Sequence, residues 1–202
     1  MNNINTKFWK KTALSQYVHE ADGSLTALAL FALGIIVALL HLHLRLRGLS
    51  IPGHHGLELM MALLFGRMQS KNKWAAVIIA WGAATTYLLH VTYMPMGQTL
   101  KPAVFYLANA FILDSLFRQV PTKLPIILKG IILGGASFIV KPIVTIPIAI
   151  FMEVNFGSIT KHGYFIPVLT HLTFGSIGAI CGITLASLVS HTQNKTISHN
   201  KQ

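Results

Sequence analysis

Between residues 25 and 189 the chain is almost entirely apolar, and its few charged residues fall in short gaps between apolar runs. None of the long runs has enough polar residues to form a wet helix face, and a helix that is apolar all round must be buried or surrounded by lipid. The pattern therefore predicts an all-α, polytopic integral membrane protein, a six-helix bundle. Its spans are expected at residues 25–44, 57–65, 74–93, 103–116, 124–151 and 164–189.

The second apolar run is too short to cross about 30 Å of hydrocarbon alone. We expect this short second helix to be tilted and packed inside the bundle, or to be a half-helix beside an irregular loop that lines a cavity. The membrane domain as a whole is expected at residues 24–190, with a polar tail at 191–202. The basic segment 1–23 suits either an interfacial helix on anionic lipid or a disordered leader that only sets topology.

Composition agrees with a membrane protein, because 53% of residues are hydrophobic, 10% are charged and the mean hydropathy is +0.60. The net charge of +11 is spread over the loops, so we interpret it as a topology signal and not as a nucleic-acid-binding surface. With the N-terminus inside, ten Lys and Arg residues fall on the cytoplasmic side and four on the outside. This bias predicts cytoplasmic N- and C-termini in a multi-pass protein of the cell membrane.

Ionisable groups inside a membrane are costly, so the few in this chain are candidate functional residues. On the predicted topology most of them lie in the outer half of the bundle or in the first outer loop, and we expect them to line one extracellular substrate-binding cavity. Lys141 precedes Pro142 and has two interpretations: contact with the ligand, or a structural bond to freed carbonyls or to Glu153. The predicted set is His54, His55, Glu58, Asn109, Lys141, Glu153 and His171.

The loop 45–58 carries the most specific pattern, in which two histidines stand between Gly53 and Gly56. The glycines allow tight turns, and Glu58 follows at the start of a helix, where the helix dipole favours an anion. We predict that this loop covers the mouth of the cavity and moves on binding, with Gly48 as a further hinge. His54 and His55 supply imidazoles without an evident third metal ligand, so metal binding stays open, and no cofactor is expected.

Small residues four apart occur in three spans, for example at Gly34 and Ala38, and they favour close contact between helix backbones. We expect packing within the chain, the alternative being a docking surface for another subunit. Asp114, near the inner end of the fourth span, is expected to pair with Arg118 at i+4.

The order of features along the chain resembles that of a known family. A basic outer loop leads into a short helix ending at Leu64-Phe-Gly-Arg-Met68, and a span rich in small residues and a span with Asn109 follow. A long fifth span comes next, and the last span carries His171-Leu-Thr-Phe-Gly-Ser-Ile-Gly-Ala-Ile-Cys-Gly182. Over roughly residues 25–190 this order resembles the substrate-binding S components of energy-coupling factor (ECF) transporters, including the cobalt and nickel uptake branch.

The resemblance implies a protein that captures a vitamin or a metal ion at the outer face. It also implies delivery by toppling against a separate transmembrane coupling subunit driven by two ATPases. In the family, small residues four apart on the first helix usually form the docking surface, and Gly34 with Ala38 is the nearest match here. No phosphate-binding motif occurs in this chain, so ATP coupling would have to come from a separate subunit.

Two other functions remain open beside that of a non-enzymatic binding subunit. One is a small intramembrane enzyme in which His54, His55 and Glu58 act as acid–base groups, and the other is a non-catalytic accessory subunit of a membrane complex. For a binding subunit, the mixture of basic and acidic groups around the predicted cavity fits a small, partly anionic organic molecule better than a bare divalent ion. Its expected partners are thus membrane lipid, a small-molecule or ion substrate, and the coupling subunits.

Overall fold

The computed structural model describes residues 23–43, 52–90, 96–121, 123–153 and 156–199, and within these ranges it contains helices and no strand. The elements are α3 (Gly23–His43), α4 (His55–Gln69), α5 (Ala75–Leu89), α6 (Met96–Gln119), α7 (Ile126–Gly130), the π-helical turn η2 (Ile131–Gly135), α8 (Ala136–Phe138), α9 (Val140–Phe151), α10 (Gly157–His162) and α11 (Phe165–His199).

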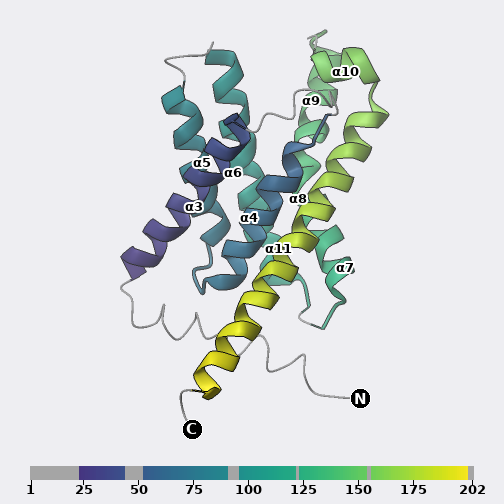
Figure 1. Cartoon of the computed structure of the whole chain (residues 1–202). Helices are drawn as coiled ribbons and strands as arrows, with labels where there is room; N and C mark the ends of the chain where they lie inside the picture. Colours follow the sequence, from purple (N-terminus) through teal and green to yellow (C-terminus); the bar gives the residue numbers. More distant parts are fainter. Residues whose placement is uncertain (1–22, 44–51, 91–95, 122, 154–155, 200–202) are drawn as a thin grey trace.

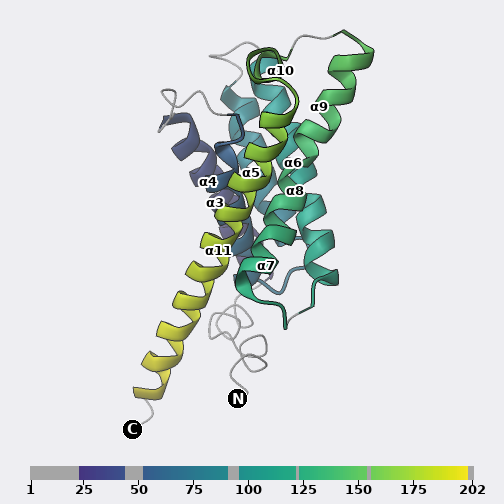
Figure 2. The ribbon, with the colours of Figure 1, turned by 90° about the vertical axis from the view of Figure 1, so that its right-hand side faces the viewer.

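The helices run up and down along a common direction, and α3 begins at the same end of the bundle at which α11 finishes (Figures 1 and 2). We call this the lower end. The upper end holds the last turn of α3, the first turn of α4, the last turn of α5, the end of α9, the short α10 and the start of α11. The last part of α11 extends beyond the other helices at the lower end.

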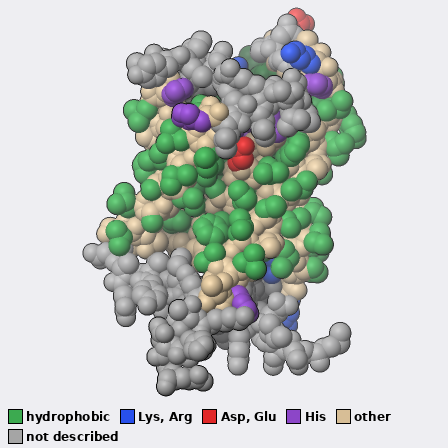
Figure 3. All heavy atoms as spheres, in the orientation of Figure 1, with side chains coloured by type: hydrophobic (Ala, Val, Ile, Leu, Met, Phe, Trp, Pro, Cys, Tyr) green, Lys and Arg blue, Asp and Glu red, His purple; other side chains and the backbone are tan. Residues whose placement is uncertain are grey.

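Three helical segments are long and apolar enough to cross a membrane: Gly23–His43, Ile126–Phe151 and Phe165–Thr192. The segment Ala75–Leu89 is a shorter apolar helix. Hydrophobic side chains cover most of the middle of the face seen in Figure 3, while Lys, Arg and His side chains gather toward its two ends. The all-α class and the presence of helices suited to membrane spanning are therefore confirmed.

The helices pack in two groups. In the first group α5 lies between α3 and α6, and in the second group α11 packs along α4, α7 and η2. Contacts of α4 with α3 and α5, and of α6 with η2, α8 and α9, join the groups. As expected, α4 lies inside the bundle, where Leu59, Met60, Leu63 and Leu64 are almost completely buried. It extends beyond the predicted run 57–65 because the polar residues that flank this run are also buried in protein.

Glycines allow the helix backbones to touch. A Cβ atom at Gly34 of α3 would overlap the Ile79 carbonyl of α5, and one at Gly82 of α5 would overlap the Phe31 carbonyl of α3. Without a hydrophobic effect between helices in lipid, such close approach is a main source of packing energy. Packing within the chain is thus confirmed for Gly34 and Ala38, which are both buried.

The predicted run 124–151 is not one continuous helix. The π-helical turn η2 interrupts it, and Gly134 within η2 lies against the carbonyl of Gly175 in α11. Pro142 lies in the first turn of α9, where its missing N–H is tolerated best. The irregular backbone therefore precedes Pro142 and includes the close glycine contact.

Candidate functional site

The upper end contains an ion pair between the two helix groups. His41, in the last turn of α3, places its Nδ1 atom 2.9 Å from Oε2 of Glu58, in the first turn of α4. The position of Glu58 is favourable because the N-terminus of a helix carries a partial positive charge. The side chain of Glu58 is 25% exposed and that of His41 is 12% exposed.

Three imidazoles meet beside this pair. The ring centroids of His41 and His55 lie 4.3 Å apart in an edge-to-face arrangement, and those of His54 and His55 lie 3.9 Å apart. The turn that precedes α4 carries His54 and His55 and is closed by a hydrogen bond from the Gly56 amide to the Gly53 carbonyl. This arrangement brings the histidines of the predicted loop onto the final turn of α3.

The backbone conformation and the surroundings of residue 53 both require a glycine. Its φ of +84° lies in the left-handed region that favours glycine, and a Cβ atom there would come within 2.9 Å of the His171 Nδ1 atom of α11. The turn can therefore approach α11 at His171 because residue 53 has no side chain. Gly48, the further predicted hinge, lies outside the described residues together with Arg45, Arg47 and the remainder of the segment 44–51.

Two tyrosines extend the polar group into α5 and α6. The hydroxyl oxygens of Tyr87 and Tyr106 lie 3.3 Å apart, and the ring of Tyr87 lies 6.4 Å from that of His41. Both tyrosines are buried, with exposures of 5% for Tyr87 and 6% for Tyr106. We refer to the following residues together as the histidine–tyrosine cluster: His41, His54, His55, Glu58, Tyr87 and Tyr106.

His171 and Lys141 form the wall of the site on the second helix group. The ring of His171 stacks on Phe138 at 5.1 Å, and its Nδ1 atom lies 2.6 Å from the carbonyl oxygen of Pro167. Within the described part of the chain, Nε2 of His171 is buried without a hydrogen-bond partner. Lys141 of α9 follows Phe138 by three residues, about one helical turn along the segment whose ring stacks on His171.

The seven predicted site residues are therefore distributed unequally. His54, His55 and Glu58 belong to the histidine–tyrosine cluster, while Lys141 and His171 border it. Asn109 lies one helical turn from Tyr106 on the same face of α6, and it is only 1% exposed. Its Oδ1 atom is buried without a partner among the described residues.

Glu153 lies apart from this group, exposed beyond the end of α9 with a φ of 52°. The expected ion pair between Glu153 and Lys141 is not among the contacts within the described ranges. Because α9 ends at Phe151 and Glu153 has a positive φ, its side chain does not continue the face of α9 that bears Lys141.

Sequence reasoning missed three members of the cluster: His41, Tyr87 and Tyr106. His41 stands in an alternating His-Leu-His-Leu-Arg stretch at the edge of an apolar run, which is typical of a span that enters the headgroup region. A signal was available for the tyrosines, since a buried tyrosine hydroxyl needs a polar partner. The described residues contain no group of three or more His, Cys, Asp or Glu side chains arranged to hold a metal ion.

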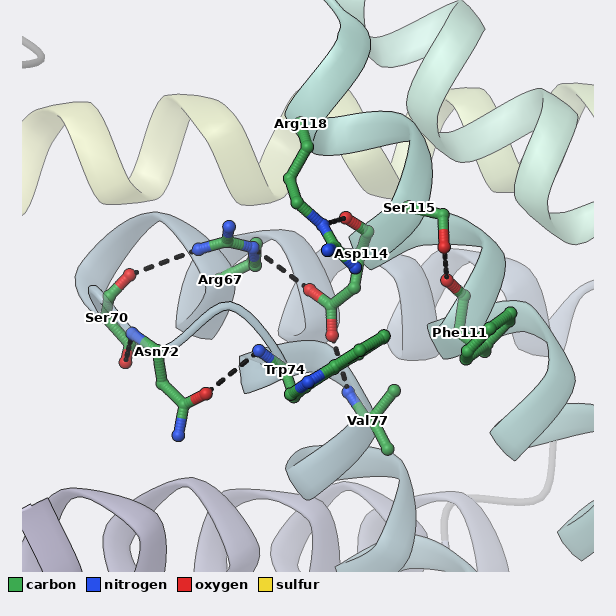
Figure 4. Close-up of polar contacts among 9 residues, drawn as sticks. All are labelled: Arg67, Ser70, Asn72, Trp74, Val77, Phe111, Asp114, Ser115 and Arg118. Carbon is green, nitrogen blue, oxygen red and sulfur yellow. Dashed lines mark hydrogen bonds and ion pairs between the residues drawn. The ribbon is translucent and has the colours of Figure 1, made fainter.

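A second polar network lies at the lower end (Figure 4). Nε of Arg67 in α4 lies 3.0 Å from Oδ1 of Asp114 in α6, in an ion pair whose geometry is not that of a directed hydrogen bond. Asp114 is completely buried, and its Oδ2 atom accepts a hydrogen bond of 3.0 Å from the Val77 amide in the first turn of α5. One carboxylate therefore links α4, α5 and α6.

The expected carboxylate pairing of Asp114 with Arg118 is replaced by the pairing with Arg67. Arg118 instead donates from Nε to the backbone carbonyl of Asp114, and its guanidinium lies 4.5 Å from the ring centroid of Trp74. Arg67 also donates to the Ser70 carbonyl and lies over the ring of Phe117. The sequence suggested Arg118, at i+4, as the partner of the Asp114 carboxylate, but α4 places Arg67 beside that carboxylate instead.

Comparisons of the chain with family models, with curated proteins and with solved structures found no match. Function therefore has to be argued from the two polar networks and from the apolar surface of the bundle.

Proposed function

We propose that this chain is the substrate-binding membrane subunit of an uptake transporter, of the kind represented by ECF S components. The single observation that carries this proposal is the convergence of polar side chains from α3, α4, α5, α6 and α11 at one end of an otherwise apolar bundle. A membrane helix bundle gains little from such a group unless it binds something. The binding region comprises the histidine–tyrosine cluster with Lys141, His171 and Asn109.

Unpaired acceptor atoms favour a binding role over a purely structural one. Nε2 of His171 and Oδ1 of Asn109 are buried without partners in the described part of the chain. A buried polar atom left unsatisfied costs about 1–3 kcal/mol, and a bound molecule that hydrogen-bonds to it removes that cost. These two acceptor atoms support the proposal that the site binds a hydrogen-bond donor.

The proposed topology has six crossings: α3, α4, α5, α6, the α7–α9 segment and α11. Both termini are cytoplasmic, and the upper end faces the outside of the cell membrane. Exposed Lys71 and Lys123 lie in lower-end connections, which agrees with the positive-inside rule.

Single cysteines test this orientation in a Cys181→Ala background. We expect a membrane-impermeant thiol reagent added outside intact cells to label Ser158→Cys in α10 and to leave Lys71→Cys unlabelled until the cells are opened. The reverse labelling pattern would refute the orientation.

The partners proposed for such a subunit are membrane lipid, a separate transmembrane coupling subunit and ATPases. Gly34 and Ala38 are engaged by α5, so docking of a coupling subunit on this chain would use another surface. Exposed apolar side chains of α3, such as Ile36 and Leu40, are available on the same helix.

Binding is tested by native mass spectrometry of the full chain, purified from its membrane in mild detergent. We expect one small molecule to be retained per chain and to be lost from His55→Ala. The matched control is His43→Ala, because His43 is exposed and its Nδ1 lies 2.9 Å from the Leu39 carbonyl oxygen of its own helix. Absence of any retained small molecule would contradict the proposal.

A second candidate function rests on the His41–Glu58 contact. A carboxylate that orients an imidazole is an arrangement used in general acid–base catalysis. An enzyme would release its bound molecule chemically changed, whereas a binding subunit releases it unchanged. Comparing the masses of the bound and released molecules therefore separates the two functions, and an accessory subunit would show neither binding nor turnover.

A further inference from the structure

The chemistry of Lys141 and His171 restricts the kind of molecule that the proposed site accepts. These two residues come from α9 and α11, and neither has a role in holding the histidine–tyrosine cluster together. Their role as ligand contacts rests on the proposed function, in which a ligand enters this site.

The proton on the His171 ring can be assigned. Nδ1 lies 2.6 Å from the Pro167 carbonyl oxygen, which only accepts, so Nδ1 carries a hydrogen and donates it. The ring is only 3% exposed, and no carboxylate of the described residues pairs with it, so the uncharged imidazole is the form that such burial accommodates. In that neutral tautomer Nε2 has a lone pair and no hydrogen.

His171 therefore offers an acceptor that nothing in the described part of the chain uses. Stacking on Phe138 and the hydrogen bond to Pro167 fix the plane of the ring, so this acceptor has a defined direction. The matching group on a ligand is an N–H or an O–H.

Lys141 has the opposite requirement. No carboxylate of the described residues forms an ion pair with it. An ammonium among apolar helices without a counter-charge is expensive, and an anion beside it removes much of that cost. A bare divalent cation would instead be repelled by Lys141.

We propose that the ligand is a small organic anion that also carries an N–H or O–H donor. Lys141 binds its anionic group, and Nε2 of His171 accepts a hydrogen bond from its donor. A hydroxy acid, an amino acid derivative and a heterocyclic acid with a ring N–H all belong to this class.

The test exposes the full chain in lipid nanodiscs to a small-molecule cell extract separated into anionic, neutral and cationic fractions. Native mass spectrometry then identifies what each fraction leaves bound. We expect retention from the anionic fraction only. In D₂O the bound molecule should gain more mass than its acidic groups explain, because of its additional exchangeable hydrogens.

The possible results separate the two proposals. Retention of a neutral or cationic molecule, or of an anion without a further exchangeable hydrogen, would overturn this inference and leave the binding function standing. Retention of nothing from any fraction would overturn both.

Substitutions then assign the two contacts with the identified anion. Lys141→Met should weaken binding at least tenfold and Lys141→Arg should retain most of it, while Lys161→Met, at an exposed lysine of α10, should have no effect. His171→Phe keeps an aromatic ring against Phe138 and should weaken the parent ligand about tenfold. It should not further weaken an analogue whose donor is methylated.

If Lys141→Met binds within twofold of the wild type, the anion contact is refuted. If His171→Phe weakens the parent ligand and its methylated analogue equally, the donor contact is refuted. The analogue comparison decides this point even where the substitution lowers the yield of folded protein, because both ligands are measured on the same sample.

Discussion

The two ends of the bundle each join the two helix groups by one ion pair, but the pairs differ in what surrounds them. At the lower end, Asp114 is completely buried and binds both Arg67 and the Val77 amide. At the upper end, Glu58 is partly exposed, and acceptor atoms of nearby residues are left without partners in the described part of the chain. The carboxylate at the lower end is paired within the protein, whereas Nε2 of His171 and Oδ1 of Asn109 at the upper end have no described hydrogen-bond partner.

This difference assigns stability to one end and function to the other. A buried pair is weak evidence of net stabilisation, but removal of one partner is expensive because it leaves an uncompensated charge. A partly exposed pair contributes about 0–1 kcal/mol. Substitutions at the two ends should therefore separate unfolding from binding.

The largest expected effect is that of Asp114→Ala. It leaves Arg67 without its carboxylate and removes the acceptor from the Val77 amide, at a cost of about 3–5 kcal/mol. Thermal unfolding in detergent should show a large decrease in Tm or little folded protein. Glu58→Ala is the matched carboxylate control and should change the Tm much less, and equal decreases would contradict the contrast between the ends.

The next effect concerns the glycine contact that holds α3 on α5. Gly34→Val places a side chain where the Ile79 carbonyl lies, and overpacking of this kind costs about 1–3 kcal/mol. Gly23→Val is the control at the start of the same helix, because nothing lies within 4 Å of a Cβ atom there. We expect a lower Tm for Gly34→Val only, and an unchanged Tm would show that α3 can move away from α5 without cost.

Gly53 and Gly163 both have a positive φ but differ in their surroundings. Gly53→Ala and Gly163→Ala both place alanine at positive φ, at a cost of about 1 kcal/mol or more, but a new Cβ meets His171 only at residue 53. Both Tm values should decrease, that of Gly53→Ala by at least as much, while binding of the retained small molecule should weaken for Gly53→Ala alone. Equal affinities would show that the approach of this turn to His171 does not matter for the site.

The smallest expected change in stability is that of Glu58→Gln, which keeps the size of the side chain and removes the charge from the His41 contact. A part-exposed ion pair of this kind is worth about 1 kcal/mol or less, so the Tm should hardly change. Binding should change more than the Tm does, which native mass spectrometry can measure on the same preparation. A large decrease in Tm with unchanged binding would contradict the assignment of binding to the upper end.

The sequence was most informative where a pattern reports on the environment directly. Unbroken apolar runs predicted the helices, and small residues four apart predicted the contact of Gly34 with α5. Boundaries were less accurate, because α4 continues through Arg67 to Gln69, where burial depends on partners far away in the chain. The same reason explains Asp114, for which proximity along a helix suggested Arg118 and tertiary packing supplied Arg67.

The upper site shows a similar limit. Glycines beside histidines pointed to the turn at residues 53–56, but no local pattern indicated that His41 would complete it from the end of the preceding helix. Tyr87 and Tyr106 belong to different helices, and their hydroxyl contact depends on how α5 and α6 pack. Glu153 could not be placed from the sequence because its position depends on the backbone turn after α9.

The pairing of Arg67 with Asp114 has a consequence for biosynthesis. α4 emerges from the ribosome with a charged guanidinium near its end, while the carboxylate that neutralises it lies two helices later in the chain. In the proposed topology α4 crosses the membrane, so until α6 has been made it lacks the partner that offsets the cost of its arginine, and a nascent chain ending after α5 should hold α4 in the membrane poorly. Insertion of this protein is then a cooperative event in which a late helix secures an early one.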